Sequence, residues 1–142
     1  MNAWRMLLIY AAVTLLALAL LAAAAAVMIY AAAKKKPVRK PLVFLAVSAA
    51  LAAGVVLFTN SHGTYIRFDD WWIYRSGAQK TEERYGAPEI GGYVQGKPGR
   101  LGYYIYKDNG PIMPDHLRHY YYVEYDGQGN VTEIYDGAQP GG

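Results

Sequence analysis

The chain has 142 residues, contains no cysteine and carries a formal net charge of +3. Its hydrophobic content of 54% exceeds the usual value for soluble domains, and the lack of cysteine excludes a disulfide scaffold, a thiolate metal site and a lipid-modified N-terminal cysteine. The first 60 residues hold six of the 14 basic residues and no acidic one, whereas all 11 acidic residues follow them. The C-terminal part is therefore acidic, which argues against a nucleic-acid partner.

Two uncharged, apolar runs occupy the N-terminal part, at residues 6–33 and 42–58. A helix of roughly 20 apolar residues crosses a bilayer, so we expect residues 1–60 to form a hairpin of two transmembrane helices. The alternative for the first run is a cleaved signal peptide, although its apolar region normally spans only about 7–15 residues. Neither run contains Asp, Glu, Lys, Arg or His, which argues against an ion or proton path through these two helices.

A basic loop at residues 34–41 separates the two runs, and Pro37 and Pro41 prevent one continuous helix. The positive-inside rule places this loop in the cytoplasm and both chain ends outside, in a multi-pass protein of the cytoplasmic membrane. A second interpretation is that the loop binds anionic lipid head groups. The basic residues are Lys34, Lys35, Lys36, Arg39 and Lys40.

Small residues recur every four positions in the second run, at Ala46, Ala50 and Gly54. Such a row lets two membrane helices approach closely. We expect it to pack against the first helix near Ala19 and Ala23, and the alternative is a dimerisation face.

Residues 61–75 are expected to form a juxtamembrane linker with extended pieces at 64–68 and 71–74. The adjacent Trp71 and Trp72 suit either the membrane interface or the core of the following domain.

A short helix is predicted over residues 77–85. Ser76 and Gln79 have the spacing of a capping box, and Gly86 followed by Pro88 is a typical stop signal. So short a helix is marginal alone in water and must dock on other structure.

Three β-prone segments follow, at residues 103–106, 117–125 and 130–135. Asn109 and Gly110 suit a tight turn, and the Asp/Gly-rich segment 126–129 predicts a hairpin between the last two segments. The predicted fold class is α+β: two transmembrane helices, then an extracytoplasmic domain at 76–137 with one short helix on a three-stranded antiparallel sheet. Residues 138–142 are expected to be a flexible tail.

Alternation along the long strand divides its side chains between two faces. One face is the more apolar and should meet the helix; it comprises Leu117, His119, Tyr121, Val123 and Tyr125. The other face comprises Arg118, Tyr120, Tyr122 and Glu124. Because Trp, Tyr and Arg are enriched at binding hot spots, the predicted binding surface is Trp71, Trp72, Arg118, Tyr120 and Tyr122. The alternative is that these tyrosines are simply good strand formers.

The segments Arg84-Tyr85-Gly86-Ala87-Pro88, Tyr103-Tyr104-Ile105-Tyr106 and 121–131 (YYVEYDGQGNV) together resemble the SmpA/OmlA (BamE) type of small envelope domain. The resemblance covers about residues 76–135. It implies a helix ended by a Gly-x-Pro turn, three antiparallel strands and an envelope-facing binding role. The lipid-bearing N-terminal cysteine of that family and its second helix have no counterpart in this sequence.

Asp115, His116 and His119 form a compact ligand-like group, but a metal site needs three or four converging ligands. No nucleophile–base pattern occurs, and Glu82 and Glu83 do not form a placed acid/base pair. We therefore expect no enzyme, no metal and no cofactor. The predicted function is a membrane-anchored binding domain, an accessory or scaffold subunit for another envelope protein; the alternative is a module that binds cell-wall glycan.

Overall fold

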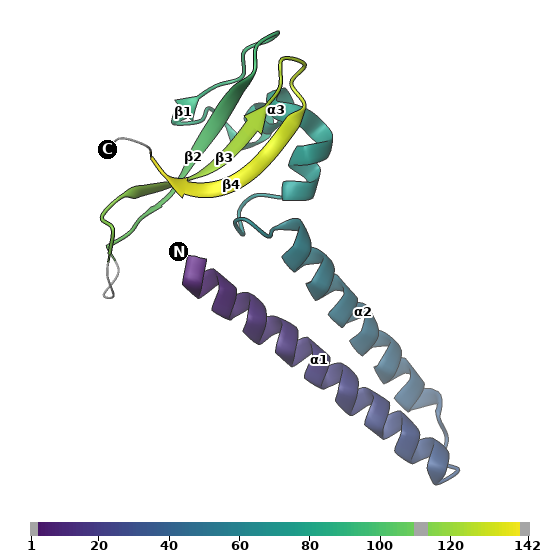
Figure 1. Cartoon of the computed structure of the whole chain (residues 1–142). Helices are drawn as coiled ribbons and strands as arrows, with labels where there is room; N and C mark the ends of the chain where they lie inside the picture. Colours follow the sequence, from purple (N-terminus) through teal and green to yellow (C-terminus); the bar gives the residue numbers. More distant parts are fainter. Residues whose placement is uncertain (1–2, 110–113, 140–142) are drawn as a thin grey trace. The chain divides into compact units, whose positions relative to one another are not determined.

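The computed structural model describes residues 3–109 and 114–139 (Figure 1). The chain divides into two compact units, one over Leu7–Asn60 and the other over the C-terminal part from Ser61. The elements are α1 (Ala3–Ala33), α2 (Arg39–Ser61), α3 (Asp70–Tyr85), β1 (Ile90–Gly91), β2 (Gly99–Lys107), β3 (Arg118–Tyr125) and β4 (Val131–Ala138). The architecture is α+β, as predicted.

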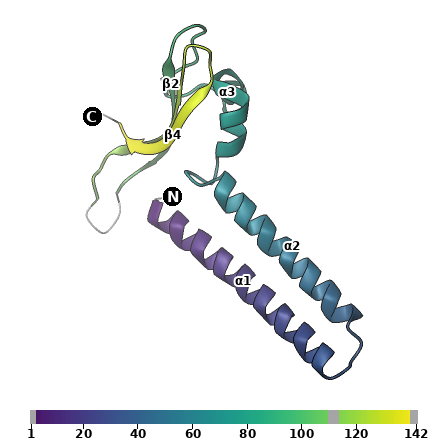
Figure 2. The ribbon, with the colours of Figure 1, turned by 45° about the vertical axis from the view of Figure 1, so that its right-hand side comes forward.

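The first unit consists of two long apolar helices that run side by side in opposite directions (Figures 1 and 2). Both are long and apolar enough to cross a membrane, judged by length and composition. Apart from Ala25, the buried and half-buried residues of α1 from Tyr10 onward recur at alternating steps of four and three, as do those of α2 from Pro41 to Thr59. They are Tyr10, Thr14, Ala17, Leu21, Ala24, Met28 and Ala31 in α1, and Pro41, Leu45, Ser48, Ala52, Val55 and Thr59 in α2.

This seam has the heptad spacing of packed helices, and it differs from the predicted one. Ala46, Ala50 and Gly54 are exposed, and so are Ala19 and Ala23. The contact is made instead through the buried pair Ser48 and Ala52 of α2, which point in another direction around the helix. The expectation that the Ala46 row faces the first helix is therefore wrong.

The connection between α1 and α2 is shorter than the predicted loop 34–41. Helix α2 begins at Arg39, so Lys40 and Pro41 lie in its first turn. Proline is tolerated there because the first N–H groups of a helix have no partner within the helix.

In the second unit α3 begins at Asp70, inside the segment predicted to be a linker. The Asp69 carboxylate caps it by accepting a hydrogen bond from the Trp72 backbone N–H at 3.0 Å. The prediction that residues 71–74 are extended is therefore wrong, because a capped helical turn precedes the predicted helix 77–85. The helix ends at Tyr85 and Gly86, as its stop signal predicts.

A kink at Gly77 joins the two halves of α3. Its φ of 82° lies in the left-handed region, and a Cβ atom there would lie 2.9 Å from the Gly129 carbonyl oxygen. The backbone N–H of Ala78 donates to that same carbonyl at 2.9 Å, which ties the kink to the β3–β4 turn. Glycine suits both the conformation and the close approach.

The sheet has the order β1-β2-β3-β4 with antiparallel neighbours throughout. The prediction of three strands is corrected to four: the two-residue β1 adds to β2 through the pairs Ile90–Gly102 and Gly91–Leu101. The predicted β3–β4 hairpin is confirmed. In its turn the Asp126 carboxylate accepts hydrogen bonds from the N–H groups of Gln128 and Asn130, each at 2.9 Å. The predicted turn at Asn109 and Gly110, and the tail beyond residue 139, lie partly or wholly outside the described residues.

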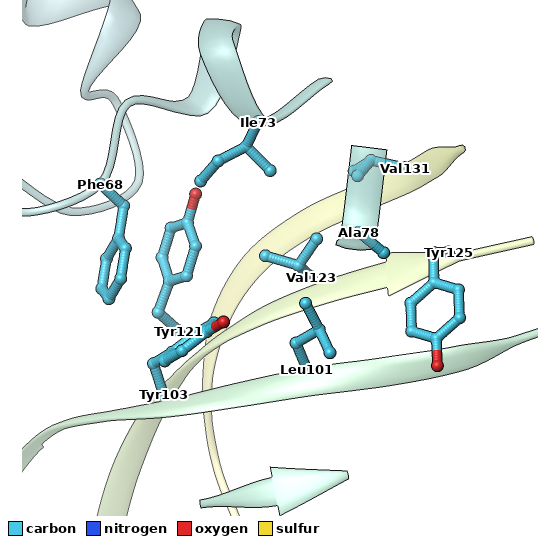
Figure 3. Packing of buried hydrophobic residues seen from close by; sticks show 9 residues of the cluster. All are labelled: Phe68, Ile73, Ala78, Leu101, Tyr103, Tyr121, Val123, Tyr125 and Val131. Atoms are coloured by element: carbon cyan, nitrogen blue, oxygen red, sulfur yellow. The ribbon is translucent and has the colours of Figure 1, made fainter. Parts of the chain in front are cut away.

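The core lies between α3 and one face of the sheet (Figure 3). Tyr121, Val123 and Tyr125 of β3 contribute to it, which confirms the predicted helix-facing side of this strand. The segment before α3 belongs to the same core, because Phe68 is fully buried and its ring stacks on Tyr121 at 4.1 Å. The other members are Ile73, Ala78, Leu101, Tyr103 and Val131.

Candidate functional site

The sheet face opposite the core carries three residues of the predicted binding surface: Arg118, Tyr120 and Tyr122. Tyr120 is only 2% exposed and Tyr122 only 1%. The expectation that these two rings are available at the surface is therefore wrong. Arg118 remains exposed at the edge of this face.

Cross-strand neighbours cover both rings. Tyr104 packs edge-on against Tyr120 with centroids 5.9 Å apart, and Tyr135 lies 5.2 Å from Tyr122. Opposite Tyr122 in the register stands Gly102, where a Cβ atom would come within 3.0 Å of the Tyr122 ring. Because Gly102 has no side chain, the ring can lie over the β2 backbone, as aromatic residues do beside a strand glycine.

Paired charges lie over these aromatic rings. The Arg118 guanidinium is 2.7 Å from the Glu89 carboxylate and lies 4.6 Å from the centre of the Tyr104 ring. Burial raises the pKa of Tyr120, whose hydroxyl donates to Glu89 at 3.4 Å. An exposed ion pair of this kind contributes little stability. It does, however, pair the Arg118 guanidinium with the Glu89 carboxylate. This face therefore presents a layer of covered aromatic rings with paired charges above it.

The two tryptophans of the predicted surface point to different environments on α3. Trp72 is half-buried against the core, with the Arg84 guanidinium 4.2 Å from its ring centre. Trp71 is 44% exposed, and Tyr74, three residues later on the same helix, is 48% exposed. The helix packs on the core face of the sheet, so Trp71 and Arg118 belong to opposite sides of this unit. The five predicted residues do not form one surface.

Tyr74 is the binding candidate that the sequence pattern missed. Residues three apart are neighbours only on a helix, and segment 71–74 was expected to be extended. The signal that could have identified the helix is Asp69, a favourable N-cap residue.

A buried carboxylate lies beneath the start of α3. Asp70 is 7% exposed and accepts a hydrogen bond from the Tyr121 hydroxyl at 2.6 Å and another from the Thr64 N–H at 2.9 Å. Burial, and secondly the Asp70 charge, raise the pKa of Tyr121 far above its ordinary value. The network ties the segment after α2 to the centre of the sheet, which is a structural role.

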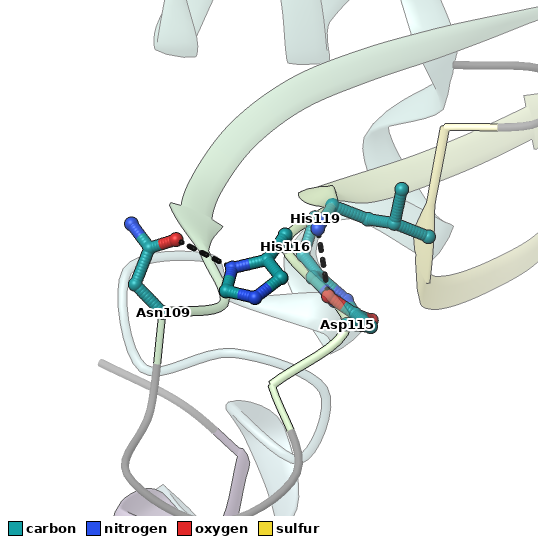
Figure 4. A network of polar contacts seen from close by, with 5 residues as sticks. Asn109, Asp115, His116 and His119 are labelled. Carbon is teal, nitrogen blue, oxygen red and sulfur yellow. Dashed lines mark hydrogen bonds and ion pairs between the residues drawn. The ribbon is translucent and has the colours of Figure 1, made fainter.

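The group at Asp115, His116 and His119 separates into two pairs (Figure 4). His119 Nε2 lies 2.8 Å from Asp115 Oδ2, and His116 Nδ1 lies 3.3 Å from Asn109 Oδ1. The Leu117 N–H is the main cause that lowers the pKa of the Asp115 carboxyl, and His119 adds to it. Within residues 3–109 and 114–139 no three His, Cys, Asp or Glu side chains converge as metal ligands.

The adjacent acidic residues Glu82 and Glu83 also have separate partners. Glu82 accepts a hydrogen bond from the Tyr93 backbone N–H at 2.7 Å, and Glu83 accepts one from the Gln79 side chain at 3.0 Å. The first contact fastens the loop before β2 to α3, and the second lies along the exposed helix surface. Their geometry is that of structural contacts.

The basic residues predicted to set topology are exposed: Lys34, Lys35, Lys36, Arg39 and Lys40. The Lys36 ammonium lies 5.4 Å from the centre of the Tyr30 ring at the end of α1. These charges therefore remain available to solvent or to lipid head groups.

Comparisons with models of protein families, with curated proteins and with solved structures gave no match. The exposed pair Trp71 and Tyr74 is the candidate site that the geometry supports, and the resemblance to the SmpA/OmlA type remains an expectation from sequence.

Proposed function

We propose that this chain is a membrane-anchored, non-catalytic binding protein that displays its C-terminal unit outside the cytoplasm as an accessory or scaffold subunit for another envelope protein. The observation that carries the proposal is the exposed pair Trp71 and Tyr74 on α3.

The distribution of polar groups in α1 and α2 supports membrane anchoring. Large apolar side chains such as Leu15, Leu51 and Leu57 are more than half exposed. The hydroxyl-bearing Thr14 and Ser48 lie instead on the seam between the helices. A pair of helices that turns apolar residues outward and polar residues inward suits a lipid environment. The basic loop then favours an orientation with both chain ends outside.

The burial of the other aromatic side chains supports a role for Trp71 and Tyr74 in recognition of a partner. Most large aromatic side chains of the second unit pack in the core or under cross-strand neighbours, as Tyr120 and Tyr122 do. Trp71 and Tyr74 are left open on one helix, with the exposed Arg75 beside them. Trp, Tyr and Arg together are the residues that dominate protein–protein hot spots.

Two observations support a protein partner over a glycan in this proposal. A glycan-binding surface built on Tyr120 and Tyr122 would need the flat faces of their rings exposed, and both rings are covered. The order of a helix, a Gly-x-Pro turn and antiparallel strands is also what the resemblance to the SmpA/OmlA type implies for an envelope-facing binding domain.

The test is photo-crosslinking of the full chain in native membranes, with a photoreactive residue at Trp71 or at Tyr74. Gln79, exposed on the same helix, is the matched control. We expect a discrete protein adduct from the first two positions and none from the third. Adducts to glycan alone, equal labelling from all three positions, or no adduct from Trp71 and Tyr74 would contradict the proposal.

A further inference from the structure

A groove runs along α2 on the side away from α1. It has a volume of about 550 Å³ and is lined by Arg39, Lys40, Val43, Phe44 and Val47. The three apolar residues are 45–61% exposed, so the groove is open to the surroundings. The seam residues of α2 lie on the opposite side of the helix, and the groove is therefore not part of the helix–helix contact.

The groove is charged at one end and apolar along its length. Arg39, Val43 and Val47 follow one another at steps of four residues, which is about 6 Å of helix rise per step. Lys40 and Phe44 form a second row beside them. Two cations thus stand at the start of the helix, and the apolar side chains continue from them toward the middle of the span.

The unit supplies no negative charge to match these cations. The first 60 residues contain no acidic residue, so no carboxylate side chain of this unit is available to pair with Arg39 or Lys40. The guanidinium of Arg39 offers the planar donor geometry that binds phosphate oxygens, and Lys40 adds a second charge.

We propose that this groove binds one anionic phospholipid, with its phosphate between Arg39 and Lys40 and one acyl chain along Val43, Phe44 and Val47. The inference rests on the proposed membrane anchoring. Its occupant follows from charge complementarity: an amphiphile with a phosphate at one end and a hydrocarbon chain matches the order of charges and apolar side chains along the groove.

The test measures which lipids the purified full chain retains from mixed micelles with equal amounts of phosphatidylglycerol and phosphatidylcholine, counted by native mass spectrometry. We expect preferential retention of phosphatidylglycerol. The double variant Arg39→Gln/Lys40→Gln should lower that retention about tenfold, because each basic residue near an anionic lipid surface strengthens the binding of that lipid about severalfold. The matched control Lys34→Gln/Lys35→Gln removes the same charge outside the groove and should lower it by about twofold or less.

Equal losses in the two double variants would overturn the proposal, because they indicate a diffuse attraction to the basic loop. Equal retention of both lipids by the unmodified chain would overturn it as well.

A second variant tests the apolar part of the groove. Val43→Ala/Phe44→Ala should weaken retention of long-chain phosphatidylglycerol more than that of a short-chain form. An equal effect on both lipids would contradict the placement of the acyl chain. Alkaline extraction of membranes separates the two proposals, because release of the chain contradicts anchoring itself, whereas a retained chain without lipid preference contradicts only the groove.

Discussion

Replacing Phe68 with alanine is expected to lower the free energy of unfolding of the C-terminal unit by about 3–5 kcal/mol, the usual cost of removing a buried aromatic ring. Phe68 is fully buried. Its ring stacks on Tyr121 and lies 5.0 Å from Tyr85 and 5.4 Å from Tyr103. The ring therefore joins the segment after α2, the end of α3 and two strands, and its loss leaves a cavity among all of them.

The matched control for Phe68→Ala is Ile66→Ala, two residues earlier, because Ile66 is 38% exposed. It should cost no more than about 1 kcal/mol. Chemical unfolding of the full chain in detergent, followed by near-ultraviolet circular dichroism of the tyrosines, measures both. Equal stability of the Phe68→Ala variant and the unmodified chain would show that the segment before α3 is a detached linker.

Replacing Tyr121 with phenylalanine is expected to cost about 1–3 kcal/mol near neutral pH, because it leaves a buried carboxylate one donor short. The Tyr121 hydroxyl donates to Asp70 at 2.6 Å, and the Thr64 N–H is the other donor to that carboxyl group within the described part of the chain. The same substitution at Tyr74, which is 48% exposed, should change the stability by no more than about 0.5 kcal/mol.

The stability of the C-terminal unit should also fall at alkaline pH. Burial, and secondly Asp70, raise the pKa of Tyr121 above its ordinary value of 10.0, so the folded state keeps a proton that the unfolded state releases. The resulting stabilisation is complete below pH 10.0 and is lost as the pH rises above that value. Burial raises the pKa of Tyr103 in the same direction, so it adds to the fall.

Unfolding free energies of the full chain at several values between neutral pH and strongly alkaline pH measure this dependence. The Tyr121→Phe variant should start lower and decline less steeply, because one of the buried tyrosines with a raised pKa is gone. Parallel curves for the variant and the unmodified chain would contradict the assignment of the alkaline loss to Tyr121.

The elements that the sequence predicted correctly depend on local chemistry. Gly86 followed by Pro88 marks the end of α3, and the carboxylate of Asp126 organises the β3–β4 turn from within that turn. The alternation along β3 identified the core-facing side because a strand has a fixed period of two. Each of these signals lies within a few residues of the feature it specifies.

The features that were missed depend on residues distant in the sequence. Strand β1 has only two residues, and its pairing with β2 gives no periodic pattern. The burial of Tyr122 requires Gly102 opposite it and Tyr135 beside it, and these come from two other strands. Of the predicted binding residues, only Trp71 and Arg118 are exposed, because cross-strand and helix–sheet packing decides which aromatic rings are covered.

The central claim, that α1 and α2 span a membrane and hold the C-terminal unit outside, is tested most directly by labelling single cysteines. The unmodified chain has none, so Lys34→Cys between the helices and Gln128→Cys in the exposed β3–β4 turn each introduce a unique thiol. In intact cells that express the full chain, a membrane-impermeant maleimide should label Gln128→Cys at once and Lys34→Cys only after permeabilisation. Labelling of Lys34→Cys in intact cells, or protection of Gln128→Cys, would contradict the account.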